Sequence, residues 1–118
     1  MDQMPYSMDG PRRNVVLAAI REVCSHRGWL LLAAHVRTTH VHFVVEAEVE
    51  PEPILNSIKA YASRRLNEMG MDAQGRKRWA RHGSTRWLWN DDDVGSAVRY
   101  VIEEQGEGMA VFVSEDFR

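Results

Sequence analysis

The chain has 118 residues, 44% of them hydrophobic, and these values fit one domain with a hydrophobic core of its own. The formal net charge of −2 excludes a strongly basic nucleic-acid-binding domain, so a surface that binds nucleic acid must concentrate its positive charge locally. Cys24 is the single cysteine, which excludes an internal disulfide, and we expect it in the core. Because no apolar run reaches the about 20 residues of a membrane span, we expect a soluble, cytoplasmic protein.

The first half of the chain predicts a tail, a helix and a hairpin. Residues 1–10 are polar without a clear period and predict a flexible tail. Apolar residues recur at helical spacing from Pro11 to Arg27, and Gly28 suits the end of that helix. Residues 29–36 and 40–49 are rich in Val, Leu and Phe and predict two strands of an antiparallel hairpin.

The second half of the chain predicts two more helices and a closing strand. Two prolines, Pro51 and Pro53, end the second strand, and residues 54–70 have one apolar helical face. Residues 72–90 contain a candidate short strand, WLW, near their end. Three aspartates from Asp91 suit the start of a third helix that runs to Gly106, and MAVFV predicts the last strand.

This order of elements predicts an α+β fold, a ferredoxin-like antiparallel sheet covered by helices. Such a sheet usually begins with a strand before its first helix, and the sequence has no convincing match to that strand. We therefore expect residues 11–118 to form a single domain that is missing its first strand. Truncation of the domain at its N-terminus would explain the missing strand.

Four residues with metal-binding or nucleophilic side chains recur at informative spacings. His40 and His42 lie two apart on a predicted strand, so both rings point to the same face. Tyr100 and Glu104 lie four apart on the third helix and also share a face. If this helix packs against the histidine strand, two imidazoles and one carboxylate can bind a cation beside a phenol. Each motif alone is more often structural, so the hypothesis depends on their combination.

The segment RKRWARHGSTRWLW interleaves cations with aromatic rings and contains no acidic residue. Cations bind phosphates and aromatic rings stack on unpaired bases, so the pattern indicates binding of single-stranded DNA. Arg64 and Arg65 on the second helix extend this candidate face. The alternative is that the tryptophans belong to the core and the arginines to the solvated surface. The candidate DNA-binding residues are Arg64, Arg65, Arg76, Lys77, Arg78, Trp79, Arg81 and Arg86.

Between Pro11 and Val113 the sequence resembles the HUH single-tyrosine transposases of bacterial insertion sequences and of the REP-associated kind. LLAAHVRTTHVHFVV resembles the hairpin with the family's histidine strand, and ILNSIKAYASRRLN resembles the helix after it. RWARHGSTRWLW resembles the tryptophan-containing segment, and AVRYVIEEQG resembles the helix that carries the nucleophile.

The resemblance implies an enzyme that cleaves and rejoins single-stranded DNA through a 5′-phosphotyrosine. Tyr100 is the implied nucleophile, and His40 and His42 are the implied ligands of Mg²⁺ or Mn²⁺. Glu104 is the implied third ligand. Many REP-associated members have Asn-Pro after the tyrosine, but this chain has Glu-Glu-Gln-Gly, so Gln105 competes for that role. The resemblance further implies a DNA hairpin as substrate and a homodimer.

Two other functions remain open from the sequence. The first is a domesticated or catalytically weak protein that binds single-stranded or hairpin DNA with the same surface, which the missing strand favours. The second is a ferredoxin-like metal-binding or regulatory module without a DNA partner. Only the His-x-His pair supports that module. The segment RKRWARHGSTRWLW, residues 76–89 and here called the Arg/Trp segment, argues against it.

Overall fold

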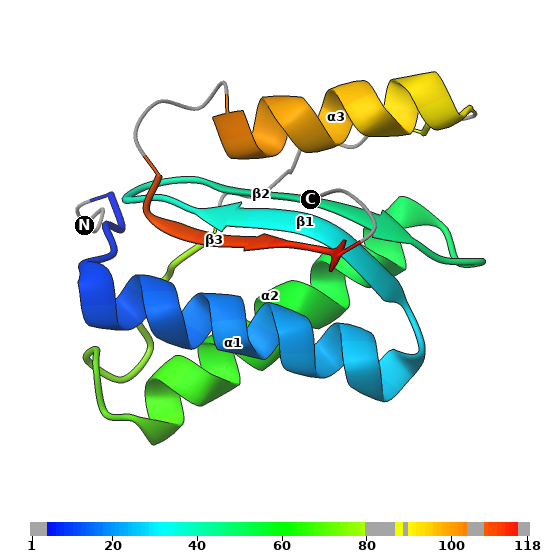
Figure 1. Cartoon of the computed structure of the whole chain (residues 1–118). Helices are drawn as coiled ribbons and strands as arrows, with labels where there is room; N and C mark the ends of the chain where they lie inside the picture. The colour runs from blue at the N-terminus through cyan, green and yellow to red at the C-terminus, as the bar shows by residue number, and fades with distance from the viewer. Residues whose placement is uncertain (1–4, 80–86, 89, 104–107, 116–118) are drawn as a thin grey trace.

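The computed structural model describes residues 5–79, 87–88, 90–103 and 108–115. Its three strands form an antiparallel sheet in the order β2-β1-β3. Helices α1 and α2 cover one face of this sheet and α3 covers the other (Figure 1). The elements in chain order are α1 (Gly10–Arg27), β1 (Leu30–Val36), β2 (Val41–Glu46), α2 (Pro51–Glu68), α3 (Asp91–Glu103) and β3 (Ala110–Val113). The described residues confirm the predicted α+β fold.

Local signals set the ends of α1. The Asp9 carboxylate accepts a hydrogen bond from the Arg12 backbone N–H over 3.0 Å, which caps the first turn. Gly28 ends the helix with φ at 75°, a conformation that favours glycine. Cys24 is buried on the inner face of this helix as expected, and burial raises the pKa of its thiol to about 11.

Helix α2 begins earlier than the sequence predicted. We expected Pro51 and Pro53 to end a strand, but both lie in the first turn of the helix. Proline fits there because N–H groups of the first turn need no partner within the helix. The predicted short strand WLW was wrong for Trp87 and Leu88, which lie in no strand, and Trp89 is outside the described residues.

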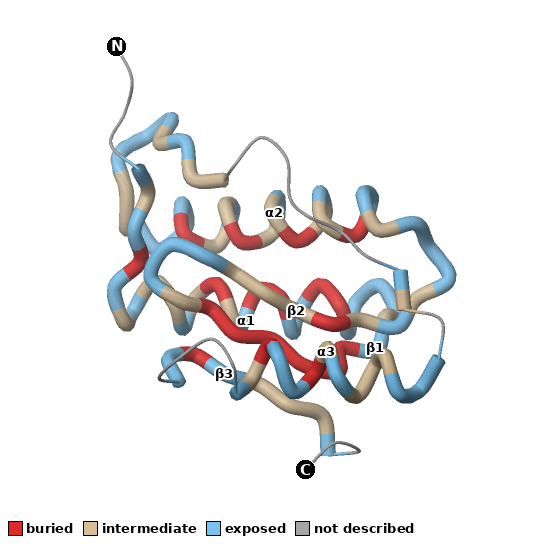
Figure 2. Tube along the Cα trace, turned by 90° about the horizontal axis from the view of Figure 1, so that it is seen from above, coloured by how far each residue is buried: buried red, intermediate tan, exposed pale blue. Residues whose placement is uncertain are grey.

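The sheet separates two hydrophobic clusters. On one face, Leu31, Ala34 and Val36 of β1 pack with the inner faces of α1 and α2. On the other face, Leu32 and Ala33 pack with α3. The pairing with β2 shifts between Leu31 and Ala33, so two consecutive residues face α3. Figure 2 shows buried residues along β1 and along the inner sides of the helices.

The residues just before α1 pack against the domain. Met8 is buried, and its backbone N–H donates to the carbonyl oxygen of Thr38 over 2.7 Å. The Tyr6 hydroxyl donates to the Asp72 carboxylate over 2.7 Å. Residues 5–9, part of the segment in which we expected a tail, thus connect the β1–β2 turn to the loop after α2. These five residues contain no strand.

Candidate active site

The β1–β2 hairpin brings the two predicted metal ligands together. The register pairs His35 with His42, and the Arg37 N–H donates to the His40 carbonyl oxygen over 2.8 Å. His40 thus comes just before β2, where it is exposed, whereas His42 is half-buried within the strand. The two imidazole rings stack almost parallel, with centroids 6.0 Å apart and 11° between their planes.

Both imidazoles are suited to bind a divalent cation through nitrogen. Nδ1 of His40 lies 2.8 Å from the Thr39 hydroxyl, which leaves Nε2 as the nitrogen that can bind a metal. Burial is the largest cause that lowers the pKa of His42, and positive charge nearby, including that of Arg37, lowers it further. A lower pKa favours the neutral imidazole, which is the form that binds metals.

A third histidine, His35, connects the strand to α3. It is completely buried, with Nδ1 3.0 Å from the Val101 carbonyl oxygen, while Nε2 accepts a hydrogen bond from the Met109 N–H over 3.1 Å. A carbonyl only accepts and an amide N–H only donates, so the proton is on Nδ1 and the ring is neutral. With both nitrogens engaged, His35 is not a metal ligand. Sequence reasoning missed it, although it is the one polar side chain in the apolar run LLLAAHV.

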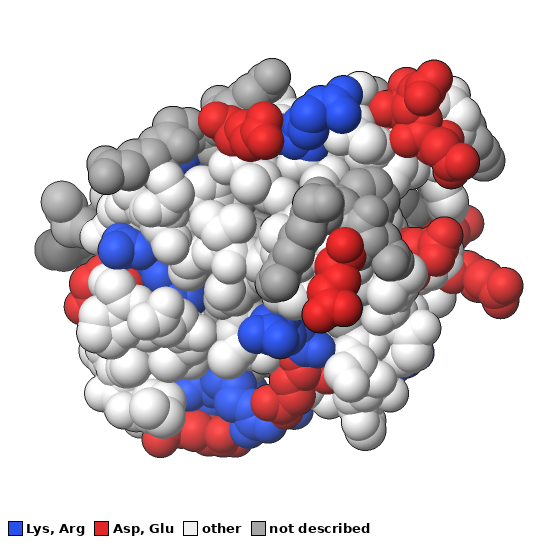
Figure 3. Space-filling model, in the orientation of Figure 1, with Lys and Arg blue, Asp and Glu red and all other residues white. Residues whose placement is uncertain are grey.

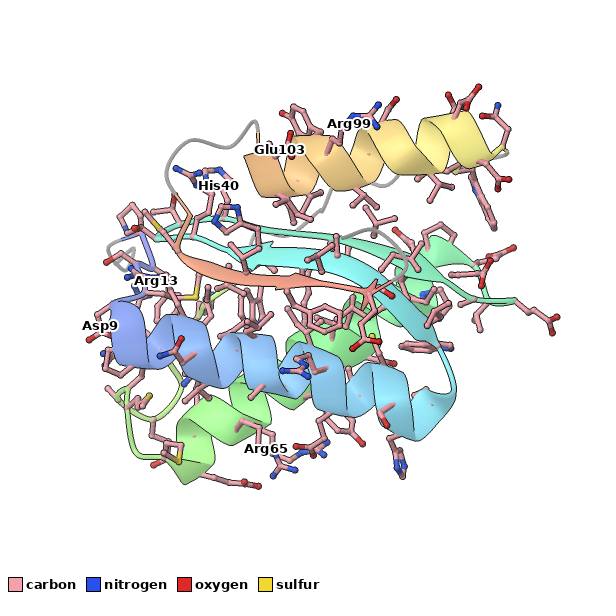
Figure 4. The ribbon with its side chains drawn as sticks, in the orientation of Figure 1. Asp9, Arg13, His40, Arg65, Arg99 and Glu103 are labelled. Carbon is pink, nitrogen blue, oxygen red and sulfur yellow. The ribbon has the colours of Figure 1, made fainter. Side chains whose placement is uncertain are left out.

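Helix α3 packs its Val98 and Val101 side chains on the sheet, and Tyr100 precedes Val101. The Tyr100 side chain is 52% exposed. Figure 4 shows His40 at the same end of the molecule as Glu103, the last residue of α3. The structure thus brings the C-terminal end of the predicted nucleophile helix to the histidine end of the sheet.

The two candidates for the third metal ligand, Glu104 and Gln105, lie outside the residues that the structure describes. Within the described ranges, no group of three His, Cys, Asp or Glu side chains is placed to hold a metal ion. The donors that are described, two stacked imidazoles at the start of β2, fit the nitrogen part of the predicted ligand set.

Two of the predicted DNA-binding residues, Arg78 and Trp79, hold the loop after α2. The Arg78 side chain is only 3% exposed, and its Nε donates to Asp72 over 3.0 Å. Another nitrogen of this guanidinium donates to the Asn67 side chain over 2.8 Å. Trp79 donates from its indole nitrogen to the Ser63 hydroxyl over 2.7 Å and packs against the core. In this structure both side chains stabilise the fold.

The other described members of the set lie in the same layer. Arg65 forms ion pairs with Glu22 of α1 and Glu68 of α2. The guanidinium of Arg64 lies 5.2 Å from the ring centroid of Tyr61. Arg76 lies 5.2 Å from the ring centroid of Tyr6, Lys77 is exposed, and Arg81 and Arg86 are outside the described residues.

The described members of the predicted basic face therefore do not converge with the histidine pair. α2 and the loop after it lie on the α1 side of the sheet, whereas His42 faces α3 (Figure 1). On the face seen in Figure 3, acidic and basic side chains alternate, and the described residues form no continuous basic band. None of the described helices is long and apolar enough to cross a membrane.

Comparison with known proteins identifies the family. Residues 7–103 match the model of the family described as "Transposase IS200 like", a span that includes His40, His42 and Tyr100. Comparison with curated proteins and with solved structures gives no match. Because the match covers most of the sequence, the chain belongs to the IS200-like transposase family.

Proposed function

We propose that this protein cleaves and rejoins single-stranded DNA through Tyr100 with the help of a divalent metal. Family membership supports a transposase role and DNA binding. The packing of α3 across the hairpin supports the roles of Tyr100 and of the metal. The residue after Tyr100 accepts a hydrogen bond from His35, and His35 is paired in the sheet with His42.

Two ring nitrogens, from His40 and His42, would hold Mg²⁺ or Mn²⁺, with Glu104 or Gln105 as the third ligand. When bound, the cation would stabilise the negative charge that develops on the nonbridging phosphate oxygens. The neutral state of His42, favoured by its lowered pKa, keeps a nitrogen lone pair ready for this role near neutral pH.

In the proposed step the Tyr100 phenolic oxygen attacks the scissile phosphorus and loses its proton. The bond from phosphorus to the 3′ oxygen breaks, and that oxygen takes up a proton to give a free 3′-hydroxyl. The 5′ side of the cut then remains attached to Tyr100 as a phosphotyrosine. This covalent bond conserves the energy of the phosphodiester, so a 3′-hydroxyl can attack it in the rejoining step without ATP.

We further propose that the substrate is a DNA hairpin and that the active protein is a homodimer. The exposure of Tyr100 supports this arrangement, since an exposed nucleophile can serve the histidines of a second copy. A catalytically weak binder of hairpin DNA is the competing function, and one assay distinguishes the two.

The test is incubation with labelled hairpin oligonucleotides and Mn²⁺, followed by a denaturing gel. The wild-type protein should give a covalent protein–DNA band. Tyr100→Phe should bind the oligonucleotide without forming the band. Tyr61→Phe, a matched change on α2, should keep it. A band from Tyr100→Phe would refute the nucleophile, and binding by the wild type without any band would support the weak binder.

A further inference from the structure

The turn of the β1–β2 hairpin carries a cation that the sequence analysis did not single out. Arg37 continues the antiparallel pairing one residue beyond β1, because its N–H donates to the His40 carbonyl oxygen. Side chains alternate along a strand, so the Arg37 side chain emerges on the same face as His35 and His42. This is the face that α3 covers.

The guanidinium of Arg37 is incompletely paired. Its Nη1 atom is buried, and in the described part of the chain it has no hydrogen-bond partner. Buried polar atoms in folded proteins are almost always paired, and a permanently charged group is especially unfavourable without a partner. An unpaired donor of this kind is expected where a ligand supplies the missing acceptor.

The surroundings of Arg37 indicate what that ligand is. Its backbone pairs with that of His40 across the hairpin, and its side chain shares a face with His42, so the guanidinium belongs to the same face as the two imidazoles. An anion is the ligand that best suits such a donor, because it supplies an acceptor and also balances the positive charge of the guanidinium. The guanidinium offers donors in one plane that match the oxygens of a phosphate, and a phosphate also provides oxygens for a metal held by the histidines.

We infer that Arg37 binds a backbone phosphate of single-stranded DNA beside His40 and His42. The inference deepens the proposed function and rests on it for the identity of the phosphate. It gives the histidine face a phosphate-binding cation, whereas Arg65 and Arg78 are engaged in ion pairs on the other side of the sheet.

A role in binding can be separated from a structural role. Arg37→Met keeps most of the side-chain volume and removes the donors. If the guanidinium of Arg37 is unpaired until a ligand binds, Arg37→Met removes an unpaired buried group. The urea concentration at the midpoint of unfolding of the free protein should then stay the same or rise. A lower midpoint would show that Arg37 supports the fold, which overturns the inference.

Binding is then measured by fluorescence anisotropy with a labelled hairpin oligonucleotide in EDTA, so that neither metal nor cleavage contributes. Arg37→Met should weaken binding about tenfold at low salt and reduce the slope of log Kd against log salt by about 0.7, the value for one contact to a single strand. Arg37→Lys should restore the slope but not the full affinity. Arg27→Met, which removes an exposed arginine at the end of α1, should change neither.

A second readout identifies the source of the phosphate. The ¹⁵N–¹H signal of the Arg37 side chain should shift with micromolar oligonucleotide, but only with millimolar inorganic phosphate. A shift with inorganic phosphate and none with the oligonucleotide would assign the position to free phosphate and overturn the inference. An unchanged affinity and slope in Arg37→Met would also overturn it.

These outcomes are separate from those of the cleavage assay. If the wild type forms the covalent adduct but Arg37→Met binds DNA equally well, the proposed function stands and the role of Arg37 fails. If binding depends on Arg37 but no adduct forms, the phosphate contact stands and the proposed cleavage fails. A wild-type protein that binds no single-stranded DNA contradicts both.

Discussion

His35 donates from Nδ1 to the carbonyl oxygen of Val101 over 3.0 Å, which joins the central strand to α3 at the residue after Tyr100. Through its other nitrogen His35 also accepts the N–H of Met109, next to β3. One buried imidazole therefore holds both described ends of the segment between α3 and β3. It thereby links the end of the tyrosine helix to the strand that pairs with the histidine strand.

Replacing His35 with leucine should destabilise the domain and disturb this arrangement. Leucine fills a similar volume but leaves the Val101 carbonyl and the Met109 N–H without their partner, which costs about 1–3 kcal/mol. The free energy of unfolding, measured in urea, should fall by that amount, and the Met109 amide should exchange its hydrogen faster. His26→Leu, an exposed histidine on α1, should leave both unchanged. Unaltered stability and exchange in His35→Leu would mean that the bridge contributes nothing.

Most of the fold could be predicted from the sequence because its helices and strands have clear periods. The predicted segment from Pro11 to Arg27 differs from α1 by one residue, and the start of β3 was also placed within one residue. The irregular pairing near Leu32 could not be predicted, because a β-bulge depends on contacts across the sheet rather than on local sequence. Without it, His35 would share a face with Leu31 and would point away from α3.

The candidate site could be predicted in part for the same reason. The spacing of His40 and His42 gives a shared face directly, and their stacked rings agree with it. The states of Arg78 and Arg37 depend on the tertiary structure. Folding brings Asp72 to the buried guanidinium of Arg78, whereas Nη1 of Arg37 has no acceptor among the described residues. Composition cannot distinguish an arginine that binds DNA from one that holds a loop.

The two candidate metal ligands should bind Mn²⁺ with a pH dependence set by His42. Its pKa is lowered, chiefly by burial, so it stays neutral below the usual imidazole value of about 6.5. Metal binding should therefore persist below pH 6.5 and be lost as the pH falls through the lowered pKa. Calorimetric titration with Mn²⁺ at several pH values measures this. His42→Ala should abolish binding and His26→Ala should not. A midpoint above pH 6.5 would contradict the role of burial.

The charges around His42 allow a sharper test. Positive charge on Arg37 is one of the causes of the lowered pKa, so Arg37→Met should move that pKa back toward its ordinary value. NMR titration of the histidine rings without metal measures the change directly. An unchanged pKa of His42 in Arg37→Met would mean that the Arg37 guanidinium does not lie near the His42 ring in solution.

Asp72 should make the domain sensitive to acid. Burial would raise the pKa of this carboxyl, but hydrogen bonds from Tyr6, Arg78 and Arg12 outweigh it, so the pKa is lowered. A lowered acid pKa stabilises the fold above the unfolded value of about 4, and this stabilisation is lost as the pH falls through the folded pKa.

Asp72→Asn should therefore lower the free energy of unfolding by about 1–3 kcal/mol at pH 7, and the difference from the wild type should shrink below about pH 4. Urea unfolding at a series of pH values measures both. Glu48→Gln, an exposed carboxyl between β2 and α2, is the control and should show no such dependence. A difference that stayed constant from pH 7 to pH 3 would assign the effect to something other than ionisation.

Arg78 provides the test that separates fold from DNA binding in the Arg/Trp segment. Its guanidinium is almost completely buried against Asp72, so Arg78→Met leaves a carboxylate without a partner and should destabilise the protein. It should not change the salt dependence of DNA binding, because a buried cation releases no counterions from DNA. Arg27, exposed at the end of α1, is the comparison, since Arg27→Met should leave stability unchanged. The opposite result, a flatter salt dependence with stability intact in Arg78→Met, would place Arg78 on the path of the DNA and would require the loop after α2 to open when the strand binds.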